Sequence, residues 1–299
     1  MLSVEQQLAR GALVCPETRE TLIERDGALT TCDGLHSYLI KDGVPIFLPV
    51  GHSEGAMESE AVAAERGAAP RRLTRFQTAI DDLFNAAGDQ RSEASIRAWQ
   101  RFISRLCEDD LCIAVGGGPT RSHPFLVNLN IEASENVEVA ADAHHLPYAD
   151  GSVDAIHCEA VLEHLKDPER AVREIFRVLR PGGKVYCVTP FLQGFHGYPS
   201  HYFNPTREGH RLYFTRSGFE IEADGVCVGP SWMISSLMVE YVSMLVPIRG
   251  LRAAAVIAAR ILLLPVRFFD RLVNRSEQAH ALASTTFVYA QKPVRLSDS

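Results

Sequence analysis

The chain of 299 residues lacks several features that would assign it to other protein classes. It has no basic excess, because 30 Lys and Arg stand against 37 Asp and Glu and give a formal net charge of -7. Nonspecific binding to nucleic acid needs a basic surface, so we expect no nucleic-acid partner and a small or uncharged substrate. No uncharged run is long enough to span a bilayer, and no signal peptide opens the chain. The seven cysteines are scattered through apolar segments, as reduced thiols are, so we expect a cytoplasmic protein.

Residues 141–191 carry a chemical signal at each boundary between expected elements. Residues 153–158 form a short apolar run of strand type, and Asp167-Pro168 then starts a helix, with Asp as N-cap and Pro at the first helical position. Pro181-Gly182-Gly183 is expected to stop that helix before a second buried strand at residues 184–189. Strand, helix and strand make a βαβ unit with a right-handed crossover. The sequence therefore predicts an α/β fold with a parallel sheet.

A glycine-rich loop, Gly116-Gly117-Gly118, directly follows another buried strand at residues 111–115. Glycine lets the backbone turn tightly and approach a ligand, and open parallel sheets bind ligands beyond the carboxyl ends of their strands. A second strand at residues 125–131 and then Asp142 follow in order. Thr120 stands where a nicotinamide dinucleotide loop would have its third glycine, which weakens that interpretation. The order of elements predicts a cofactor loop.

The motifs LPYADGSVD, VLEH and RVLRPGG together resemble those of class I S-adenosylmethionine-dependent methyltransferases. The resemblance covers roughly residues 111–219. It implies a Rossmann-like seven-stranded sheet of order 3-2-1-4-5-7-6, with the last strand antiparallel and strands six and seven at residues 219–226 and 285–292. It also implies S-adenosyl-L-methionine as the cofactor.

The same resemblance assigns the cofactor-binding residues. The glycines match the loop under the amino-acid portion of the cofactor, and Asp142 and Ala143 match the adenine contacts. Glu159 lies just past strand four, where cofactor and substrate meet. Two acids usual in the family are replaced by Ala114 and Asn130; Asn130 still hydrogen-bonds a ribose, and Glu132 offers a substitute carboxylate. The expected set is Gly116, Gly117, Gly118, Asn130, Asp142, Ala143 and Glu159.

Residues 1–50 resemble the small zinc-ribbon-like activator domain that accompanies some methyltransferases. Thr18 and Leu35 replace the second cysteine of each zinc-binding pair, which leaves Cys15 and Cys32 with His36 nearby. We expect a metal-free β module, with a zinc site as the less favoured alternative. Residues 51–106 read as a linker and a helical lead-in that starts at residue 71, and residues 107–299 as the methyltransferase domain.

The segment after the fifth strand is rich in aromatic residues and histidine, and similar segments hold substrate in the resembling enzymes. Methyl transfer to a hydroxyl needs an aligned nucleophile and a group that takes its proton, a task that suits histidine. We expect His196 as the base, His201 as the second candidate and Tyr202 as an orienting donor. His164 is expected to pin the following helix. No metal site is expected.

A long apolar insertion at residues 229–284 separates the last two expected strands and reads as two or three helices. The arginines in this segment fall on one stripe opposite an apolar face. The stripe consists of Arg252, Arg260, Arg267 and Arg271. Three interpretations stay open: a lid over the substrate pocket, a homodimer interface, and, least favoured, peripheral contact with an anionic membrane.

Two functional classes follow for an enzyme with this cofactor. The first is a methyltransferase acting on an oxygen or nitrogen of a small metabolite or glycan-related acceptor. The second uses S-adenosylmethionine without moving its methyl group, for example by an intramolecular cyclisation that releases methylthioadenosine, with a cation-π contact favouring the folded cofactor. A third reading is a non-catalytic cofactor-binding module.

Overall fold

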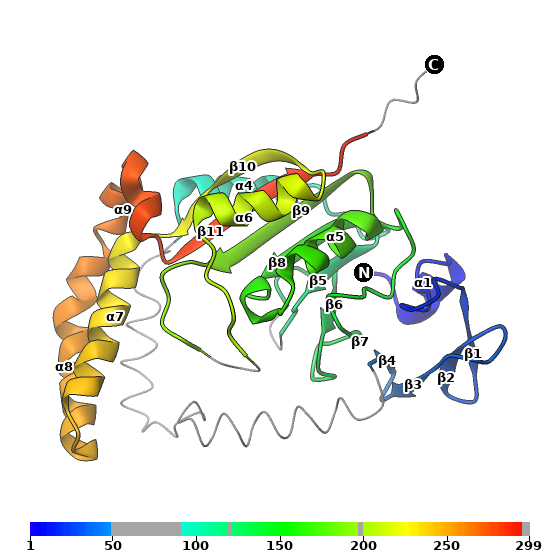
Figure 1. The fold of residues 1–299 in the computed structure, drawn as a ribbon, viewed down its shortest axis with the longest axis horizontal. Coiled ribbons are helices and arrows are strands. Elements are labelled where there is room, and N and C mark those ends of the chain that lie inside the picture. Colours follow the sequence, from blue (N-terminus) through cyan, green and yellow to red (C-terminus); the bar gives the residue numbers. More distant parts are fainter. Residues whose placement is uncertain (49–90, 119–120, 197–199, 295–299) are drawn as a thin grey trace.

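A mixed β-sheet runs through the part of the chain that the computed structural model describes, residues 1–48, 91–118, 121–196 and 200–294. Its eleven strands follow the order β1-β2-β3-β4-β7-β6-β5-β8-β9-β11-β10 (Figure 1). The expected linker, the first part of the expected helical lead-in and Thr120 lie outside these residues.

The centre of the sheet is parallel, as the βαβ pattern predicts. It consists of β5 (Cys112–Val115), β6 (Leu126–Asn130), β7 (Val139–Ala141), β8 (Val153–Glu159) and β9 (Leu179–Pro190). Alternate residues of β5 belong to different cores: Ile113 and Val115 pack in one, Cys112 and Ala114 in the other. Both faces are therefore buried, which explains why the sequence shows continuous apolar runs at these strands. The α/β prediction is confirmed.

The expected seven strands are too few, because the N-terminal residues extend the same sheet. They form β1 (Leu22–Arg25), β2 (Ala28–Thr31), β3 (Ser37–Lys41) and β4 (Val44–Phe47). Strand β4 pairs in parallel with β7, with Phe47 opposite Ala141. Pairing of this kind removes the exposed edge that β7 would otherwise present. The ring of Phe47 is buried 4.9 Å from that of Tyr38, so packing supports the pairing.

At the opposite edge, β11 (Thr285–Gln291) lies between β9 and β10 (Glu220–Val228) and is antiparallel to both. Helices cover both faces. Helix α4 (Glu93–Ile103) lies behind the sheet in Figure 1, and α5 (Pro168–Val178) and α6 (Arg207–Arg216) lie in front of it. A short helix, α1 (Val4–Ala9), opens the chain.

Helix α5 begins where the sequence predicts, but it ends earlier than predicted. Asp167 caps the helix by accepting a hydrogen bond from the backbone N–H of Arg170 at 2.9 Å, and Pro168 is the first helical residue. The helix ends at Val178, however, so the Pro-Gly-Gly motif lies inside β9 and does not stop the helix. Arg180 stands before proline, a position that disfavours helical backbone and favours extended backbone.

The expected helical insertion lies between β10 and β11. It contains α7 (Pro230–Leu245), α8 (Arg249–Arg267), α9 (Asp270–Val273) and a 3-10 turn, η2 (Glu277–Leu282). In Figure 1, α7 and α8 lie side by side and project from the sheet. No helix of the described residues is long and apolar enough to cross a membrane.

Helices α7 and α8 form a helical hairpin. Its arginines do not form the basic outer stripe that the sequence predicts. Arg267 is buried; its guanidinium donates to Ser235 Oγ at 3.1 Å and lies 5.0 Å from the ring centre of Trp232. Large apolar side chains instead face outward, Met244 and Leu262 among them. Arg267 therefore joins the two helices rather than forming a basic outer surface.

Candidate active site

A cavity of about 790 Å³ opens at the carboxyl ends of β5, β6, β7 and β8. The chain leaves β5 for β6 on one side and returns to β8 on the other, so the cavity lies where the strand order reverses. In open α/β sheets, ligands bind at this reversal. The cavity is lined by residues of both expected sites, Gly116, Asn130, Asp142, Ala143 and Tyr202, and also by His164, which was not expected there.

The glycine loop meets the cavity through Gly116 alone. Its φ of +76° is in the left-handed region, and a Cβ there would overlap the side chain of Val161. The N–H groups of Gly116 and Gly117 donate to the carbonyl of Leu129 at 2.8 and 3.1 Å and thereby hold the loop against β6. Gly117 and Gly118 are not among the residues that line the cavity. The loop thus provides a close backbone approach at one residue.

Asn130 ends β6 at the wall of the cavity, and its amide is oriented by the loop. Its Nδ2 donates to the carbonyl of Gly117 at 3.0 Å, and its Oδ1 accepts from the N–H of Ile131 at 2.7 Å. An amide has a second N–H and a second lone pair, so both ends keep one capacity for a ligand. Glu132 also lines the cavity, as a substitute carboxylate for a ribose would.

Asp142 follows β7 and faces the cavity beside Ala143. Burial raises the pKa of this carboxyl group, but hydrogen bonds and charge from His144 outweigh burial, and the pKa lies below that of an ordinary aspartate. Asp142 is therefore ionised at neutral pH and accepts hydrogen bonds. His144 holds this loop through its backbone N–H and ring Nδ1, which both contact Asp142 Oδ1.

Glu159 ends β8 but does not line the cavity. Its carboxylate accepts from the guanidinium of Arg91 at 2.8 Å. Burial raises the pKa of Glu159, but the contact with His157 at 3.3 Å and the charge of Arg91 outweigh burial, and the pKa lies below the usual range. Four of the seven expected cofactor residues meet at the cavity, and Glu159 is engaged elsewhere.

The expected catalytic residues lie on the segment between β9 and α6. Tyr202 lines the cavity, and its backbone N–H donates to the carbonyl of Glu163 at 2.7 Å. The rings of His196 and His201 are 4.4 Å apart, and His201 Nε2 contacts Asn204 Oδ1 at 2.6 Å. Neither histidine is among the residues that line the cavity. Tyr202 is the expected catalytic residue in contact with this space.

Glu163 is the site residue that sequence reasoning missed. It belongs to the 3-10 turn η1 (Leu162–His164), it is fully buried, and neither carboxylate oxygen has a hydrogen-bond partner among the described residues. Its neighbour His164, which was expected to pin the following helix, lines the cavity, and its Nδ1 contacts the carbonyl oxygen of Ser200 at 2.5 Å. The side-chain interaction with Glu163 raises the pKa of His196, and burial opposes that rise. The VLEH motif contains the signal that could have identified Glu163, an acidic residue next to His164.

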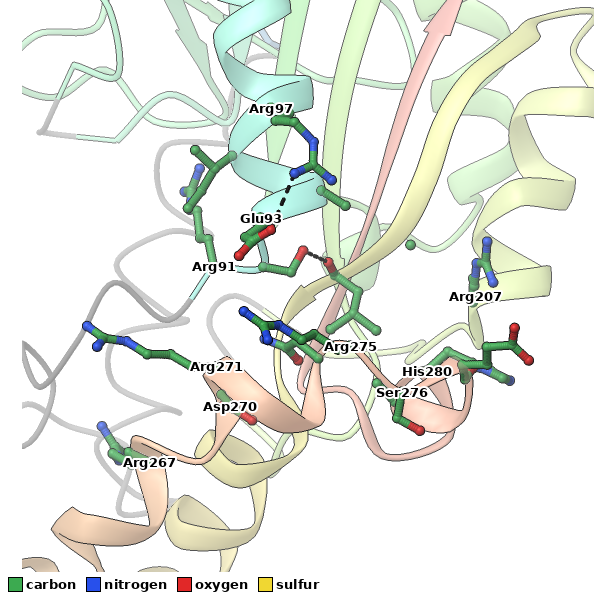
Figure 2. Close-up of a pocket in the computed structure, with 18 of the residues that line it drawn as sticks. Arg91, Glu93, Arg97, Arg207, Arg267, Asp270, Arg271, Arg275, Ser276 and His280 are labelled. Carbon is green, nitrogen blue, oxygen red and sulfur yellow. Dashed lines mark hydrogen bonds and ion pairs between the residues drawn. The ribbon is translucent and has the colours of Figure 1, made fainter.

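A second cavity of about 690 Å³ lies at the base of the helical insertion, among α4, β10, α9 and η2 (Figure 2). Arginines surround it, and several are already paired: Arg97 with Glu93 at 3.4 Å and Arg207 with Asp224 at 2.7 Å. It shares no lining residue with the first cavity. This arginine-lined space is separate from the expected cofactor site.

The cysteines expected in a degenerate zinc module are not gathered. Cys15 is buried, with its sulfur 3.1 Å from the hydroxyl of Tyr38, whereas Cys32 is exposed. In the described part of the chain, three potential metal ligands converge at Glu163, His164 and His196 and not around Cys15.

Comparison with known proteins places these features among methyltransferases. A methyltransferase-domain family profile matches residues 121–187. An uncharacterized methyltransferase of Mycobacterium sp. strain KMS is 42% identical over 165 residues, which cover 47% of this chain and 66% of that protein. An uncharacterized chloroplastic methyltransferase of Arabidopsis thaliana is 52% identical over 56 residues, 19% of this chain and only 16% of its own length.

Solved structures resemble the chain more loosely. The match to the [4+2]-cyclase SpnF covers 85% of this chain and 100% of the SpnF chain, at 17% identity and a TM-score of 0.45. A second match is phosphoethanolamine N-methyltransferase 2 of Haemonchus contortus in complex with S-adenosyl-L-methionine. It covers 74% of this chain and 58% of that chain, at 16% identity and a TM-score of 0.44. Both scores are low, so neither structure bears on the activity here. The family match and the sequence relatives support a class I S-adenosylmethionine-dependent methyltransferase domain with S-adenosylmethionine as its cofactor.

Proposed function

We propose that this chain transfers a methyl group from S-adenosylmethionine to an oxygen or nitrogen of a small metabolite or glycan-related acceptor. One observation carries the proposal: residues of the expected cofactor site and of the expected substrate segment line the same cavity. Asn130 and Asp142 stand on the strand-end side, and Ser200 and Tyr202 come from the segment after β9. Cofactor and acceptor can therefore meet in one cavity.

The strand-end residues fit the cofactor by their chemistry. Ionised Asp142 offers acceptor oxygens to the adenine amino group, and Asn130 keeps one donor and one acceptor for the ribose hydroxyls. At Gly116, the absence of a side chain lets the loop pack directly on Val161 at the cavity wall. When bound, S-adenosylmethionine supplies an electrophilic methyl carbon. Alignment of the acceptor with that carbon is the main task left to the protein.

The segment between β9 and α6, which reaches the cavity through Ser200 and Tyr202, provides groups that orient an acceptor and handle its proton. The phenol of Tyr202, 45% exposed beside the cavity, can donate to an acceptor oxygen. His196 remains the proposed base, with the carboxylate of Glu163 beside it and 43% of its own side chain exposed. His201 lies against His196 and restricts how that ring can turn.

Cofactor binding and incubation with S-adenosylmethionine test the proposal together. Calorimetry should show binding of S-adenosylhomocysteine to the purified protein. Incubation with S-adenosylmethionine should then yield S-adenosylhomocysteine only when a hydroxyl or amino acceptor is added. Methylthioadenosine formed without any acceptor would replace the proposal by the cyclisation chemistry. A protein that binds neither nucleoside would contradict both enzymatic functions.

A further inference from the structure

The buried carboxylate of Glu163 faces two imidazole nitrogens. Nε2 of His164 and Nε2 of His196 each lie 3.7 Å from Glu163 Oε1, and the three ligand atoms all lie within 4.8 Å of one another. Both carboxylate oxygens lack a hydrogen bond among the described residues, although the side chain is fully buried. A buried carboxylate without a partner is strongly unfavourable, so the site calls for a positive occupant.

The backbone fixes which imidazole nitrogens are free to bind that occupant. Nδ1 of His164 contacts the carbonyl oxygen of Ser200 at 2.5 Å, and Nδ1 of His196 contacts that of Gly194 at 3.1 Å. A carbonyl oxygen only accepts, so Nδ1 carries the hydrogen in each ring. In a neutral imidazole the lone pair is then on Nε2, and both lone pairs point into the space beside Glu163. Protein metal sites commonly orient their histidine ligands through such carbonyl contacts.

We propose that Glu163, His164 and His196 bind a divalent transition-metal cation, with Zn²⁺ as the ion that this ligand set suits. Two imidazoles and one carboxylate form a known catalytic zinc arrangement that leaves a fourth position open. In a tetrahedral site with bonds of about 2.0–2.1 Å, ligand atoms are about 3.4 Å apart. The two separations of 3.7 Å would have to shorten by a few tenths of an ångström, and the third pair, the Nε2 atoms of His164 and His196, lies within 4.8 Å.

The competing occupant is a proton on His196. An imidazolium would form a direct hydrogen bond to the carboxylate, whereas 3.7 Å is longer than such a bond and both oxygens remain without one. Glu240 of α7, close to Gly194, adds a second negative charge on the same side. One carboxylate oxygen and two Nε2 atoms, near another carboxylate, offer three ligand atoms to a doubly charged ion, whereas a single proton would bind to only one of them.

The cation deepens the proposed function and rests on it. His164 lines the cavity, so the open position would face the acceptor. A hydroxyl bound there loses its proton to water at a lower pH than a free hydroxyl, as water does on protein-bound zinc. The site would therefore select acceptors with a hydroxyl group and present an oxygen nucleophile. In this arrangement His196 would act as a ligand, the cation would lower the pKa of the bound hydroxyl, and water would take the proton.

Metal titration tests the proposal independently of turnover. Protein freed of metal with a chelator is titrated with ZnCl₂ by calorimetry, and its thermal unfolding is followed with and without Zn²⁺. We expect one ion per chain and a higher melting temperature with zinc. Glu163→Gln, of nearly the same shape, and His196→Ala should each weaken binding by more than the ~10–100-fold typical of losing an outer-sphere partner.

His280→Ala is the matched control, because Nδ1 of His280 also contacts a backbone carbonyl, that of Glu277 at 2.7 Å, outside the site. It should bind zinc like the wild type. Equal binding by all variants, or no binding by the wild type, would overturn the proposal. Circular dichroism of each variant without metal excludes unfolding as the cause of lost binding. If S-adenosylhomocysteine binding and methyl transfer both persist in the presence of chelator, the proposed catalytic role of the metal is wrong and the proposed methyltransferase function stands.

Discussion

The carboxylate of Asp142 accepts two hydrogen bonds from one residue, His144: one from its backbone N–H at 2.9 Å and one from its ring Nδ1 at 2.7 Å. The two bonds hold Asp142 Oδ1 at the cavity and keep its pKa below the usual range, against the effect of burial. His144 therefore prepares Asp142 as an ionised acceptor before any ligand arrives.

Asp142→Asn should weaken binding of S-adenosylhomocysteine by about tenfold or more. The change removes the charge, and a hydrogen bond to a charged group contributes about 1.5–3 kcal/mol. Calorimetric titration measures the effect. Asp26→Asn, in a hairpin turn of the N-terminal strands where Asn tolerates the positive φ of +50°, should leave affinity unchanged. Equal affinities for the two variants would show that Asp142 does not contact the cofactor.

Gly116→Ala and Gly118→Ala should differ sharply although they are two residues apart. Alanine at Gly116 meets both a left-handed φ, which costs about 1–2 kcal/mol, and an overlap with Val161. At Gly118 an added Cβ would meet no atom of the described residues within 4 Å, and φ is not positive. Urea unfolding should show a loss of stability for Gly116→Ala, with weaker cofactor binding, and little change for Gly118→Ala. Similar stabilities would argue against a strained, close-packed loop.

Glu174, on α5, connects the segment before β1 with the loop after β7 that holds Asp142. Its carboxylate accepts from Arg19 at 3.1 Å, from Arg177 at 2.8 Å and from the N–H of Leu146 at 3.0 Å. Burial raises the pKa of Glu174, but the hydrogen bond and charge of Arg177 outweigh burial, so the pKa is lower in the folded than in the unfolded chain. Ionised Glu174 therefore stabilises the fold above the ordinary glutamate pKa of about 4.3.

Glu174→Gln should lower the free energy of unfolding by about 1–3 kcal/mol at pH 7. As the pH falls below about 4.3 and through the lower folded pKa, the wild type loses this contribution and the difference should narrow. Urea unfolding from pH 7 to pH 3 checks the sign. A difference that stays constant with pH would mean that the charge of Glu174 has no role.

Local sequence patterns were sufficient to predict the central strands and the residues on the cofactor side of the cavity. The buried runs of β5 and β8 and the cap at Asp167 are short-range signals, and they led to the correct elements. Asn130 and Asp142 were assigned through the resemblance to methyltransferase motifs, and both lie at the carboxyl ends of parallel strands, which share one edge of the sheet. Such inferences need neighbours in sequence and little else.

Features that depend on distant contacts could not be predicted in this way. The pairing of Phe47 with Ala141 joins segments far apart in the chain, and no local pattern marks it. Glu163 sits in a readable motif, but its complete burial depends on the segment after β9 folding over it. The inward orientation of Arg267 likewise depends on α7, because helical periodicity alone does not tell which face meets a partner helix.

Tyr202→Phe should separate acceptor orientation from cofactor binding. The variant keeps the ring at the cavity and loses only the hydroxyl, so kcat/KM for a hydroxyl acceptor should fall by roughly tenfold, the value of one hydrogen bond. The affinity for S-adenosylhomocysteine should not change, because Asp142 and Asn130 lie on the other wall. Tyr241→Phe, on the exposed face of α7, is the control and should leave both quantities unaltered. If Tyr202→Phe instead weakens cofactor binding while kcat at saturating cofactor is preserved, Tyr202 belongs to the cofactor half of the cavity, and the acceptor must approach from another side.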